Sequence, residues 1–393
     1  MSKPLSPEFR LAAACCQWPP SQQKNHAIRA AGGGPIDWDK FRRVVKRQRV
    51  AGMVFEGLSA TATEAPEKLK QEIAEKANSI TRQNLLLVAE SFRLQQIFDA
   101  AKIPAAFFKG VSLAQQAYGS MAIKHSRDID LLVPPGFVQR ALRLLEGTGY
   151  QLQSPAKQLS DSQVAKVIGQ VKEVTLVHGA HRQLVELHWR PVDNPLVLAG
   201  FTADIALEYV TLSSGIAIRT FGEEEMAIYL CAHGAFHSWY RLKWLADFNA
   251  LISRKSEAEI VDLYRAAKQR NVGLCMAQGL SLCSRILHRK LPDELAAEFA
   301  ADHHVQRLVA IAIKAMAGSD EEIHDLEFGS TRLNLTHFLL GRGWRFWAAQ
   351  IRIDFINLDD VLRFPLPGKL YFLYLFFFAP LWLLRRARRN SPI

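Results

Sequence analysis

The sequence predicts an α/β (α+β) protein: a small mixed β-sheet core flanked by an N-terminal helical segment and a C-terminal helical domain. Apolar residues recur at helical spacing before residue 86 and after residue 221. Between these points, short apolar runs rich in β-branched and aromatic residues are separated by Gly and Pro. We therefore expect a helical region at 1–85, an α/β core at 86–221 and a helical domain with an apolar, Arg-rich tail at 222–393.

Two helical stretches are predicted before the core. The run DWDKFRRVVKRQRVAGMVFEGL has apolar residues at helical spacing, and Asp37 or Asp39 can cap its start. The run from Ala65 to Ile103 is predicted as a long helix, broken at most once. The chain has 393 residues, 49% of them hydrophobic, which is enough for a substantial buried core.

Short strands and helices alternate in the predicted core. Strands are expected in IPAAFF, DIDLLV, YQLQ, EVTLVH, QLVELHW and GIAIRTF. Helices are expected in GVSLAQQAYG, in DSQVAKVIGQ and in PPGFVQRALRLLEGTG, which opens with Pro and closes with Gly. After Phe221 the helical pattern returns, with a bend expected near Ser238.

The charge balance favours a polyanionic partner. The formal net charge is +11 and the pI is about 9.5, which suits a nucleotide, a nucleic acid or an anionic membrane surface. Nucleic acid is the least favoured of these, because no aromatic-basic strand pattern of a known RNA-binding module is present. The five cysteines have no zinc or disulfide spacing, and the first residues lack the apolar core of a secretory signal. We expect reduced thiols in a cytoplasmic protein.

The C-terminal stretch Leu370–Leu384 is almost entirely apolar and is followed by RRARR at 385–389. It is shorter than the ~20 residues that a spanning helix needs, and Pro380 interrupts it. Three interpretations stay open: a buried helix that closes the last domain, a hairpin in the membrane interface, and a marginal anchor. The arginines form either a solvated tail or a contact with anionic lipids, so residues 370–389 are a candidate peripheral contact with the inner membrane.

Two carboxylates lie in an otherwise apolar predicted strand. Asp128 and Asp130 are two residues apart and therefore share a face. Two carboxylates this close repel each other unless a cation lies between them, and oxygen ligands suit Mg²⁺ or Mn²⁺. The alternatives are a solvated edge strand or an ion-paired couple. We predict a metal site used in phosphoryl or nucleotidyl transfer.

A third carboxylate, Glu186, lies in another apolar strand with His188 on the same face. Three carboxylates on adjacent strands can hold two metal ions ~4 Å apart. The alternative for Glu186 is an ion pair with Arg182 or Arg190. His188 is predicted to shape the site rather than to bind the metal, because Mg²⁺ prefers oxygen ligands.

A candidate phosphate-binding turn precedes the acidic strand. Gly110 and Ser112 lie between a predicted strand and a predicted helix, where a helix N-terminus offers unpaired N–H groups to an anion. Lys109 adds a positive charge, and Lys124 and Arg127 precede the aspartates closely enough to reach the same anion.

Polar residues on the next helical region form a candidate wall for nucleotide or acceptor. His233 and His237 are four residues apart and share a helix face, with Arg241, Lys243 and Asp247 downstream. Zinc is disfavoured at the two histidines because no third ligand follows at a suitable spacing.

Together these motifs resemble the DNA polymerase β-like nucleotidyltransferase superfamily, in which a Gly-containing turn and helix precede an Asp-x-Asp strand and a third carboxylate. FFKGVSLAQQAYG, RDIDLLV, VELHW and FGEEEMAIYLCAHGAFHSWYRLKWLADF are similar, in order and spacing, to uncharacterised bacterial nucleotidyltransferases associated with polysaccharide-biosynthesis loci. The resemblance spans roughly residues 5–385. The turn reads Lys109-Gly110-Val111-Ser112 rather than Gly-Gly or Gly-Ser, so the serine is displaced by one position to Ser112, and Lys124 replaces a frequent Arg.

The resemblance implies metal-dependent transfer of a nucleoside monophosphate (NMP) from a nucleoside triphosphate (NTP) to a hydroxyl acceptor, with release of pyrophosphate. The acceptor would be a sugar, a glycan lipid or a small molecule. Asp128, Asp130 and Glu186 would be the catalytic and metal-binding residues, with Mg²⁺ or Mn²⁺ as cofactor. Two alternatives remain: a toxin-like nucleotidyltransferase that acts on tRNA or protein, and a non-catalytic, membrane-docked accessory protein of glycan biosynthesis.

Overall fold

The computed structural model describes residues 5–61, 63–155, 158–202, 207–212, 215–318, 335–378 and 380. A five-stranded sheet has the strand order β1-β2-β5-β4-β3, and a separate hairpin is formed by β6 and β7. β2 and β5 are parallel, whereas β1–β2, β4–β5 and β3–β4 are antiparallel, so the sheet is mixed as predicted. The strands are β1 (Ala106–Phe108), β2 (Asp128–Leu132), β3 (Tyr150–Ser154), β4 (Glu173–His178), β5 (Leu184–His188), β6 (Leu207–Thr211) and β7 (Ala217–Phe221).

The helices flank the sheet on both sides, as the sequence predicts. Before and within the core lie α1 (Pro7–Cys15), α2 (Gln22–Gly32), α3 (Trp38–Gln48), α4 (Ala51–Ser59), α5 (Glu67–Ala100), α6 (Gly110–Tyr118), η1 (Pro135–Phe137), α7 (Val138–Gly147) and α8 (Asp161–Gln170). After the core lie α9 (Glu223–Phe236), α10 (Leu242–Leu251), α11 (Glu257–Gln269), α12 (Gly273–Leu287), α13 (Asp293–Ala301), α14 (His303–Ala317), α17 (Trp344–Phe355), α18 (Leu358–Arg363), η2 (Gly368–Leu370) and α19 (Leu373–Phe376).

The two faces of the sheet have different environments because side chains alternate along each strand. Ile129, Leu131 and Val185 face a core built with α5 and α7. On the other face, Leu132 and Phe108 pack toward α9, and Phe108 contacts the Tyr229 ring at 5.2 Å. The acidic residues of β2 and β5 lie on this second face, beneath α9, and not in the first core.

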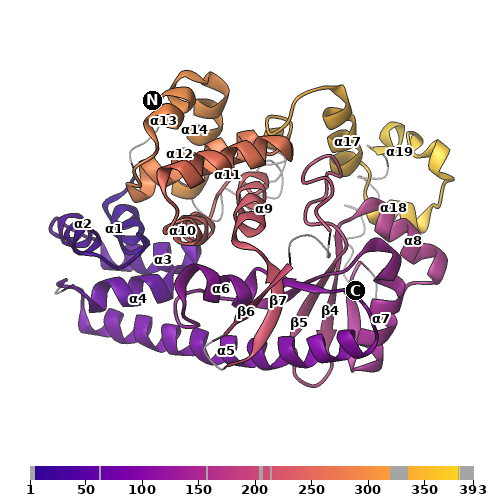
Figure 1. Cartoon of the computed structure of the whole chain (residues 1–393), viewed down its shortest axis with the longest axis horizontal. Helices are drawn as coiled ribbons and strands as arrows, with labels where there is room; N and C mark the ends of the chain where they lie inside the picture. Colours follow the sequence, from indigo (N-terminus) through magenta and orange to yellow (C-terminus); the bar gives the residue numbers. More distant parts are fainter. Residues whose placement is uncertain are drawn as a thin grey trace.

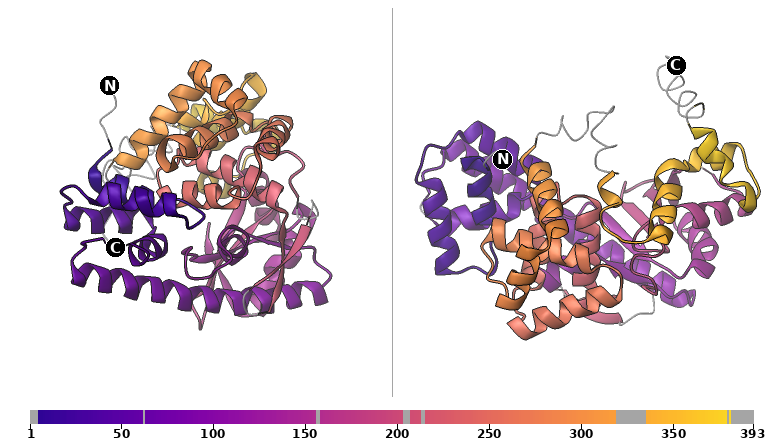
Figure 2. Two further views of the ribbon diagram at one scale, coloured as in Figure 1. Left: turned by 60° about the vertical axis from the view of Figure 1, so that its left-hand side comes forward. Right: turned by 90° about the horizontal axis from the view of Figure 1, so that it is seen from above.

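Helices from both ends of the chain share one hydrophobic core. It includes α1, α3 and α4 as well as α9, α10 and α12. Figure 1 shows α5 running along the base of the molecule, with α1–α4 at one end and α17–α19 toward the other. The view from above in Figure 2 also shows the N-terminal and the C-terminal helices at opposite sides of the molecule. The proposed domain limits at residues 85 and 221 remain predictions, because this shared core joins the first and last segments.

A fully buried tryptophan separates α9 from α10 where the sequence predicts a bend. Ser238 and Trp239 have φ angles of 47° and 51° and lie just after the end of α9. A Cβ at Gly234 would lie 2.5 Å from the Trp239 ring, so the indole can only pack against a glycine there. α5 runs unbroken for 34 residues, and the strand β6 is an element that the sequence did not predict.

The predicted membrane segment is only partly described. Tyr374 is buried, but Phe372, Leu375, Phe376 and Phe377 are exposed. The arginines of RRARR lie outside the described residues. Among the residues that are described, no helix is both long and apolar enough to span a membrane. All five cysteines are buried free thiols.

The loop that leads into β2 is fixed by α4 and α5. Asn84 is fully buried on α5 and donates hydrogen bonds to the carbonyl groups of Met121 and Lys124, at 2.6 and 2.7 Å. Gly52 on α4 touches the same loop, because a Cβ there would lie 2.4 Å from the Ile123 carbonyl oxygen. These contacts hold the loop residues that precede Asp128.

We expect Gly52→Ala to destabilise the protein by about 1–3 kcal/mol, because the added methyl group collides with backbone that cannot move freely. Urea unfolding measures the change in the free energy of unfolding. Gly136→Ala is the matched control, since a Cβ there meets no atom within 4 Å. Equal stability of the two variants would show that α4 does not clamp the loop.

Candidate active site

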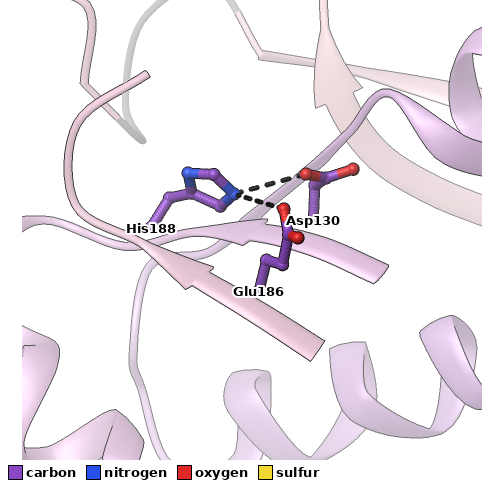
Figure 3. A group of neighbouring side chains, drawn as sticks. All are labelled: Asp130, Glu186 and His188. Carbon is purple, nitrogen blue, oxygen red and sulfur yellow. Dashed lines mark hydrogen bonds and ion pairs between the residues drawn. The ribbon is translucent and has the colours of Figure 1, made fainter. Parts of the chain in front are cut away.

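Strand register brings the acidic residues together. In the parallel pairing of β2 with β5, Asp130 lies opposite Glu186, and Leu132 lies opposite His188. One ligand atom from each of Asp130, Glu186 and His188 lies within 4.8 Å of the others (Figure 3). Asp130 on β2 therefore lies beside Glu186 on β5, and the two carboxylates are on adjacent strands.

His188 connects three carboxylates beneath the cavity. Its Nε2 lies 3.3 Å from Asp130 Oδ1 and 3.6 Å from Glu186 Oε2, and its Nδ1 lies 2.9 Å from Glu173 Oε2. Burial alone would lower the pKa of His188, but the charge of Glu173 and the bonds to the carboxylates raise it to about 9. The imidazole is therefore a buried cation at neutral pH, within a ring of acids.

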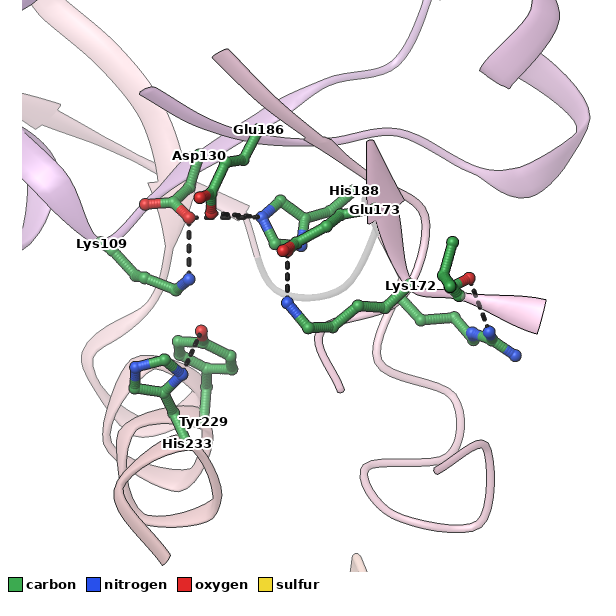
Figure 4. Close-up of polar contacts among 10 residues, drawn as sticks. Lys109, Asp130, Lys172, Glu173, Glu186, His188, Tyr229 and His233 are labelled. Atoms are coloured by element: carbon green, nitrogen blue, oxygen red, sulfur yellow. Dashed lines mark hydrogen bonds and ion pairs between the residues drawn. The ribbon is translucent and has the colours of Figure 1, made fainter. Parts of the chain in front are cut away.

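Lys109 is the second cation of the site, and its side chain is 16% exposed. Its Nζ lies 2.7 Å from Asp130 Oδ1 (Figure 4). It also lies over the rings of Phe108 and Tyr229. Burial opposes its charge, but Asp130 outweighs that effect and raises the pKa of Lys109 well above its usual value. In return, burial opposes ionisation of Asp130, yet Lys109 and His188 hold its pKa well below the usual range.

The remaining two acids are not neutralised to the same degree. Burial and the charge of Asp130 raise the pKa of Asp128, and burial raises the pKa of Glu186 despite its contact with His188. Asp128 lines the same cavity but is not part of the three-residue group formed by Asp130, Glu186 and His188. Raised carboxyl pKa values mean that Asp128 and Glu186 would gain from further positive charge.

The turn before α6 lies on the same cavity. Lys109 and Gly110 have φ angles of 59° and 43°, a left-handed conformation that costs less at glycine. A Cβ at Gly110 would lie 3.5 Å from the Asp128 carbonyl oxygen, so the turn and β2 lie close together. Ser112 is buried and does not line the cavity, whereas Lys109 and Gly110 do.

The loop cations hold different positions. Lys124 is buried and lies 3.5 Å from Asp247 Oδ2, and Asp247 also accepts a hydrogen bond of 2.9 Å from the Tyr118 hydroxyl. Arg127 is exposed and lines the cavity. Lys124 therefore links β2's leading loop to α10, and Arg127 is available at the rim.

Aromatic and basic residues of α9 and α10 form the opposite wall. The His237 ring stacks on Trp244 at 4.9 Å, and His233 meets both of them edge to face. Burial lowers the pKa of His233 well below its usual value, so this ring is neutral, whereas the His237 side chain is exposed. Within the described residues, neither histidine belongs to a group that could hold a metal ion, and Arg241 does not line the cavity.

Lys243 is a desolvated cation on this wall. Burial and then the nearby Lys124 lower its pKa to about 7. An anion placed in the cavity would offset the loss of hydration, so Lys243 favours a negatively charged ligand. The cavity has a volume of about 550 Å³ and is lined by Asp128, Asp130, Glu186, Lys243 and the two histidines among others.

Sequence reasoning missed Glu173 and its neighbour Lys172. Glu173 opens β4, pairs in register with His188 and forms an ion pair with Lys172. Burial opposes its ionisation, but His188 holds its pKa well below the usual range. The only signal in the sequence was an acid at the start of the run EVTLVH, and its meaning depends on β4 lying beside β5.

A mixed sheet with carboxylates on one face, beside a glycine turn that begins a helix, is compatible with phosphoryl or nucleotidyl transfer. The family model described as "Uncharacterised nucleotidyltransferase" matches residues 34–288. Since the match covers more than half of the chain, the protein belongs to this nucleotidyltransferase family and is a transferase.

Other comparisons add little to that assignment. No curated protein sequence matches the chain. A crystal structure of ANT(2")-Ia in complex with adenylyl-2"-tobramycin is similar at 12% identity and a TM-score of 0.34, over 47% of this chain and 98% of that one. A solution structure of the antibiotic-resistance factor ANT(2'')-Ia gives 13% identity and a TM-score of 0.34, over 48% and 94%. With TM-scores this low, the family match is the basis of the assignment.

The raised pKa of His188 predicts a pH dependence of stability. Folding raises this pKa from 6.5 to about 9, so the stabilisation is complete below pH 6.5 and is lost as the pH rises through about 9. In the metal-free protein, we expect the free energy of unfolding to fall by up to roughly 3 kcal/mol over this window. His188→Gln should remove this decrease, whatever its effect on overall stability. Parallel curves for the two proteins, measured by urea unfolding across pH 6–10, would contradict the assignment of His188 as a cation.

Proposed function

We propose that the protein transfers NMP from an NTP to a hydroxyl acceptor and releases pyrophosphate, in a reaction that depends on a divalent metal ion. The register of β2 and β5 carries the proposal, because it sets Asp130 beside Glu186. The same cavity wall also holds Asp128 and the Gly110 turn. Family membership supports NMP transfer as the reaction.

The carboxylates fit a divalent cation. Asp128, Asp130 and Glu186 offer oxygen ligands, which Mg²⁺ and Mn²⁺ prefer. The raised pKa values of Asp128 and Glu186 are what carboxylates have when they lack sufficient positive charge nearby. Bound there, the cation would supply charge that stabilises the phosphate oxygens and acidifies the acceptor hydroxyl.

The protein's own residues position the reactants. In this proposal, backbone N–H groups at the start of α6 bind the phosphates, with Lys109, Lys124 and Arg127 nearby. The oxygen of the acceptor hydroxyl attacks the α-phosphorus, and Glu186 accepts the proton of that hydroxyl. The new P–O bond forms, the bond to the bridging oxygen of the β-phosphate breaks, and pyrophosphate leaves with that electron pair.

Lys109 and His188 hold the acids in place before the substrate binds. Each lies beside Asp130 Oδ1, at 2.7 and 3.3 Å. We propose that Lys109 moves from Asp130 to the phosphates when the nucleotide enters, since both are anions within reach of a flexible side chain. Ser112 has no such role in this account, because it is buried and does not line the cavity.

The acceptor is proposed to be a sugar, glycan lipid or small molecule with a hydroxyl group, of the kind used in polysaccharide biosynthesis. The wall formed by His233, His237, Lys243 and Trp244 faces the carboxylates and is suited to hold the nucleotide base or this acceptor. A toxin-like activity on tRNA or protein and a non-catalytic accessory role are the outcomes that the following test separates from it.

We expect Asp128→Asn to reduce NMP transfer at least about 100-fold, because the variant loses a charged metal ligand. The measurement is release of pyrophosphate and transfer of label from α-³²P-labelled NTPs in a cell extract with Mg²⁺ or Mn²⁺. Asp128 is the informative position, since Asp130→Asn would also leave Lys109 buried without its partner. Removing the metal with EDTA should abolish the reaction, and Mn²⁺ should restore it.

Asp262→Asn on α11 is the matched control, because that acid is exposed and pairs with Arg265 on its own helix. It should keep full activity. Label recovered in RNA or protein would contradict the small-molecule acceptor and support the toxin-like activity. If the Asp128→Asn variant keeps its cellular function, the non-catalytic accessory role is supported and NMP transfer at this site is contradicted.

We further propose that the C-terminal region contacts an anionic membrane surface. Phe376 is 76% exposed and Phe372 is 51% exposed, in a region that also carries Arg363 and Lys369. Exposed aromatics with neighbouring cations suit the headgroup layer of a bilayer. Through this surface, a cytoplasmic protein would bind peripherally to the inner membrane.

Phe376→Asp is expected to weaken sedimentation with phosphatidylglycerol-containing vesicles by about fivefold or more, because it places a charge where an aromatic ring enters the interface. The control is Leu85→Asp, since Leu85 is 51% exposed on α5. Equal sedimentation with purely zwitterionic vesicles, or an unchanged Phe376→Asp variant, would remove this part of the proposal.

A further inference from the structure

A second cavity adjoins the active site. It has a volume of about 480 Å³ and lies between α3, α4 and the N-terminal part of α5, which Figure 1 shows side by side. We call it the basic groove. Its floor is apolar and is formed by Val45, Ala51, Leu69, Ile73 and Ile80.

The rim of the groove is strongly basic. Arg42, Lys46, Arg49, Lys76 and Arg127 line it, and Glu72 is the single acid among the lining residues. Arg42 contacts Asp39 at 3.5 Å, but both side chains are exposed, so that pair offsets little of the charge. An apolar floor under a cationic rim is complementary to a molecule with an apolar part and an anionic group.

The groove and the active site share a wall. Arg49, His125 and Arg127 line both cavities, and Arg127 directly precedes Asp128. Burial, Lys76, Lys243 and Lys124 lower the pKa of His125 to about 4, so the junction carries an excess of positive charge. An anionic group at this junction would lie between the apolar floor and the carboxylates.

We propose that the basic groove binds the acceptor, and that the acceptor is an anionic amphiphile: a hydroxyl-bearing molecule whose phosphate or carboxylate group adjoins an apolar chain. The inference rests on the proposed NMP transfer. The chain lies over Ile73 and its neighbours, the anionic group lies beside Lys76 and Arg49, and the hydroxyl faces Asp128.

Other acceptor classes use only part of this surface. An uncharged sugar would bring neither an apolar part to the floor nor an anion to the rim. A nucleic acid would engage the cations but would not use the apolar floor. The combination favours the amphiphile, and the other classes become outcomes of the test.

The test measures binding of octyl phosphate to the full chain by calorimetry, without nucleotide or metal. Octyl phosphate should bind at least about tenfold more tightly than butyl phosphate, because four more methylene groups meet the floor. Inorganic phosphate and octyl glucoside should both bind at least about tenfold more weakly than octyl phosphate, since each lacks one of the two matching parts.

The rim is tested by charge reversal at exposed positions that do not threaten folding. The double variant Lys46→Glu with Lys76→Glu should weaken octyl phosphate binding about tenfold or more. Lys70→Glu is the control, because Lys70 is exposed on α5 but does not line the groove. Equal affinity of the double variant and the control would overturn the inference, and so would inorganic phosphate binding as tightly as octyl phosphate.

The result also separates this inference from the proposed function. Asp128→Asn should bind octyl phosphate normally, since the groove does not use that carboxylate. Octyl phosphate binding in a protein without NMP transfer would support the groove and remove the function. NMP transfer by a protein that does not bind octyl phosphate would contradict acceptor binding in the basic groove but leave the proposed function intact. Full displacement of octyl phosphate by metal-free ATP would have the same consequence.

Discussion

The arrangement of the site depends on the crowding of one buried and three half-buried carboxylates on one face of a β-sheet. Asp130 is 4% exposed, and Glu186, Glu173 and Asp128 lie close enough to it to influence one another's ionisation. Such a group is stable only when positive charge lies among the acids. Lys109 and His188 provide that charge inside the protein, and the structure around them is organised to hold the two cations in place.

Several local features follow from this charge balance. Lys109 takes a left-handed backbone conformation at the start of α6, which turns its side chain toward Asp130 and Tyr229. His188 is oriented by Glu173, because β4 lies beside β5. Asn84 on α5 fixes the loop before β2, so the register of the acidic strand is linked to the longest helix of the fold.

Much of this could be predicted from the sequence, and the reasons for the rest are physical. Period-2 alternation placed Asp128 and Asp130 on one face, and the same rule placed Glu186 with His188, because side-chain direction in a strand is a local property. The strand order that sets Glu173 against His188 is not local. Lys109 was expected to contribute positive charge to the phosphate site. No sequence pattern reveals that it instead forms an ion pair with Asp130 on β2. Ser112 lies at the predicted turn, but it is buried and does not line the cavity.

The central claim is that these clustered carboxylates hold a divalent cation beside a phosphate-binding turn. Anomalous diffraction from crystals soaked with Mn²⁺ and a non-hydrolysable NTP tests it most directly. The account predicts a manganese peak bound by Asp130 with Asp128 or Glu186, triphosphate oxygens at Gly110, and Lys109 turned from Asp130 toward the phosphates. Manganese bound elsewhere, or phosphates away from Gly110 with the Lys109–Asp130 pair intact, would contradict it.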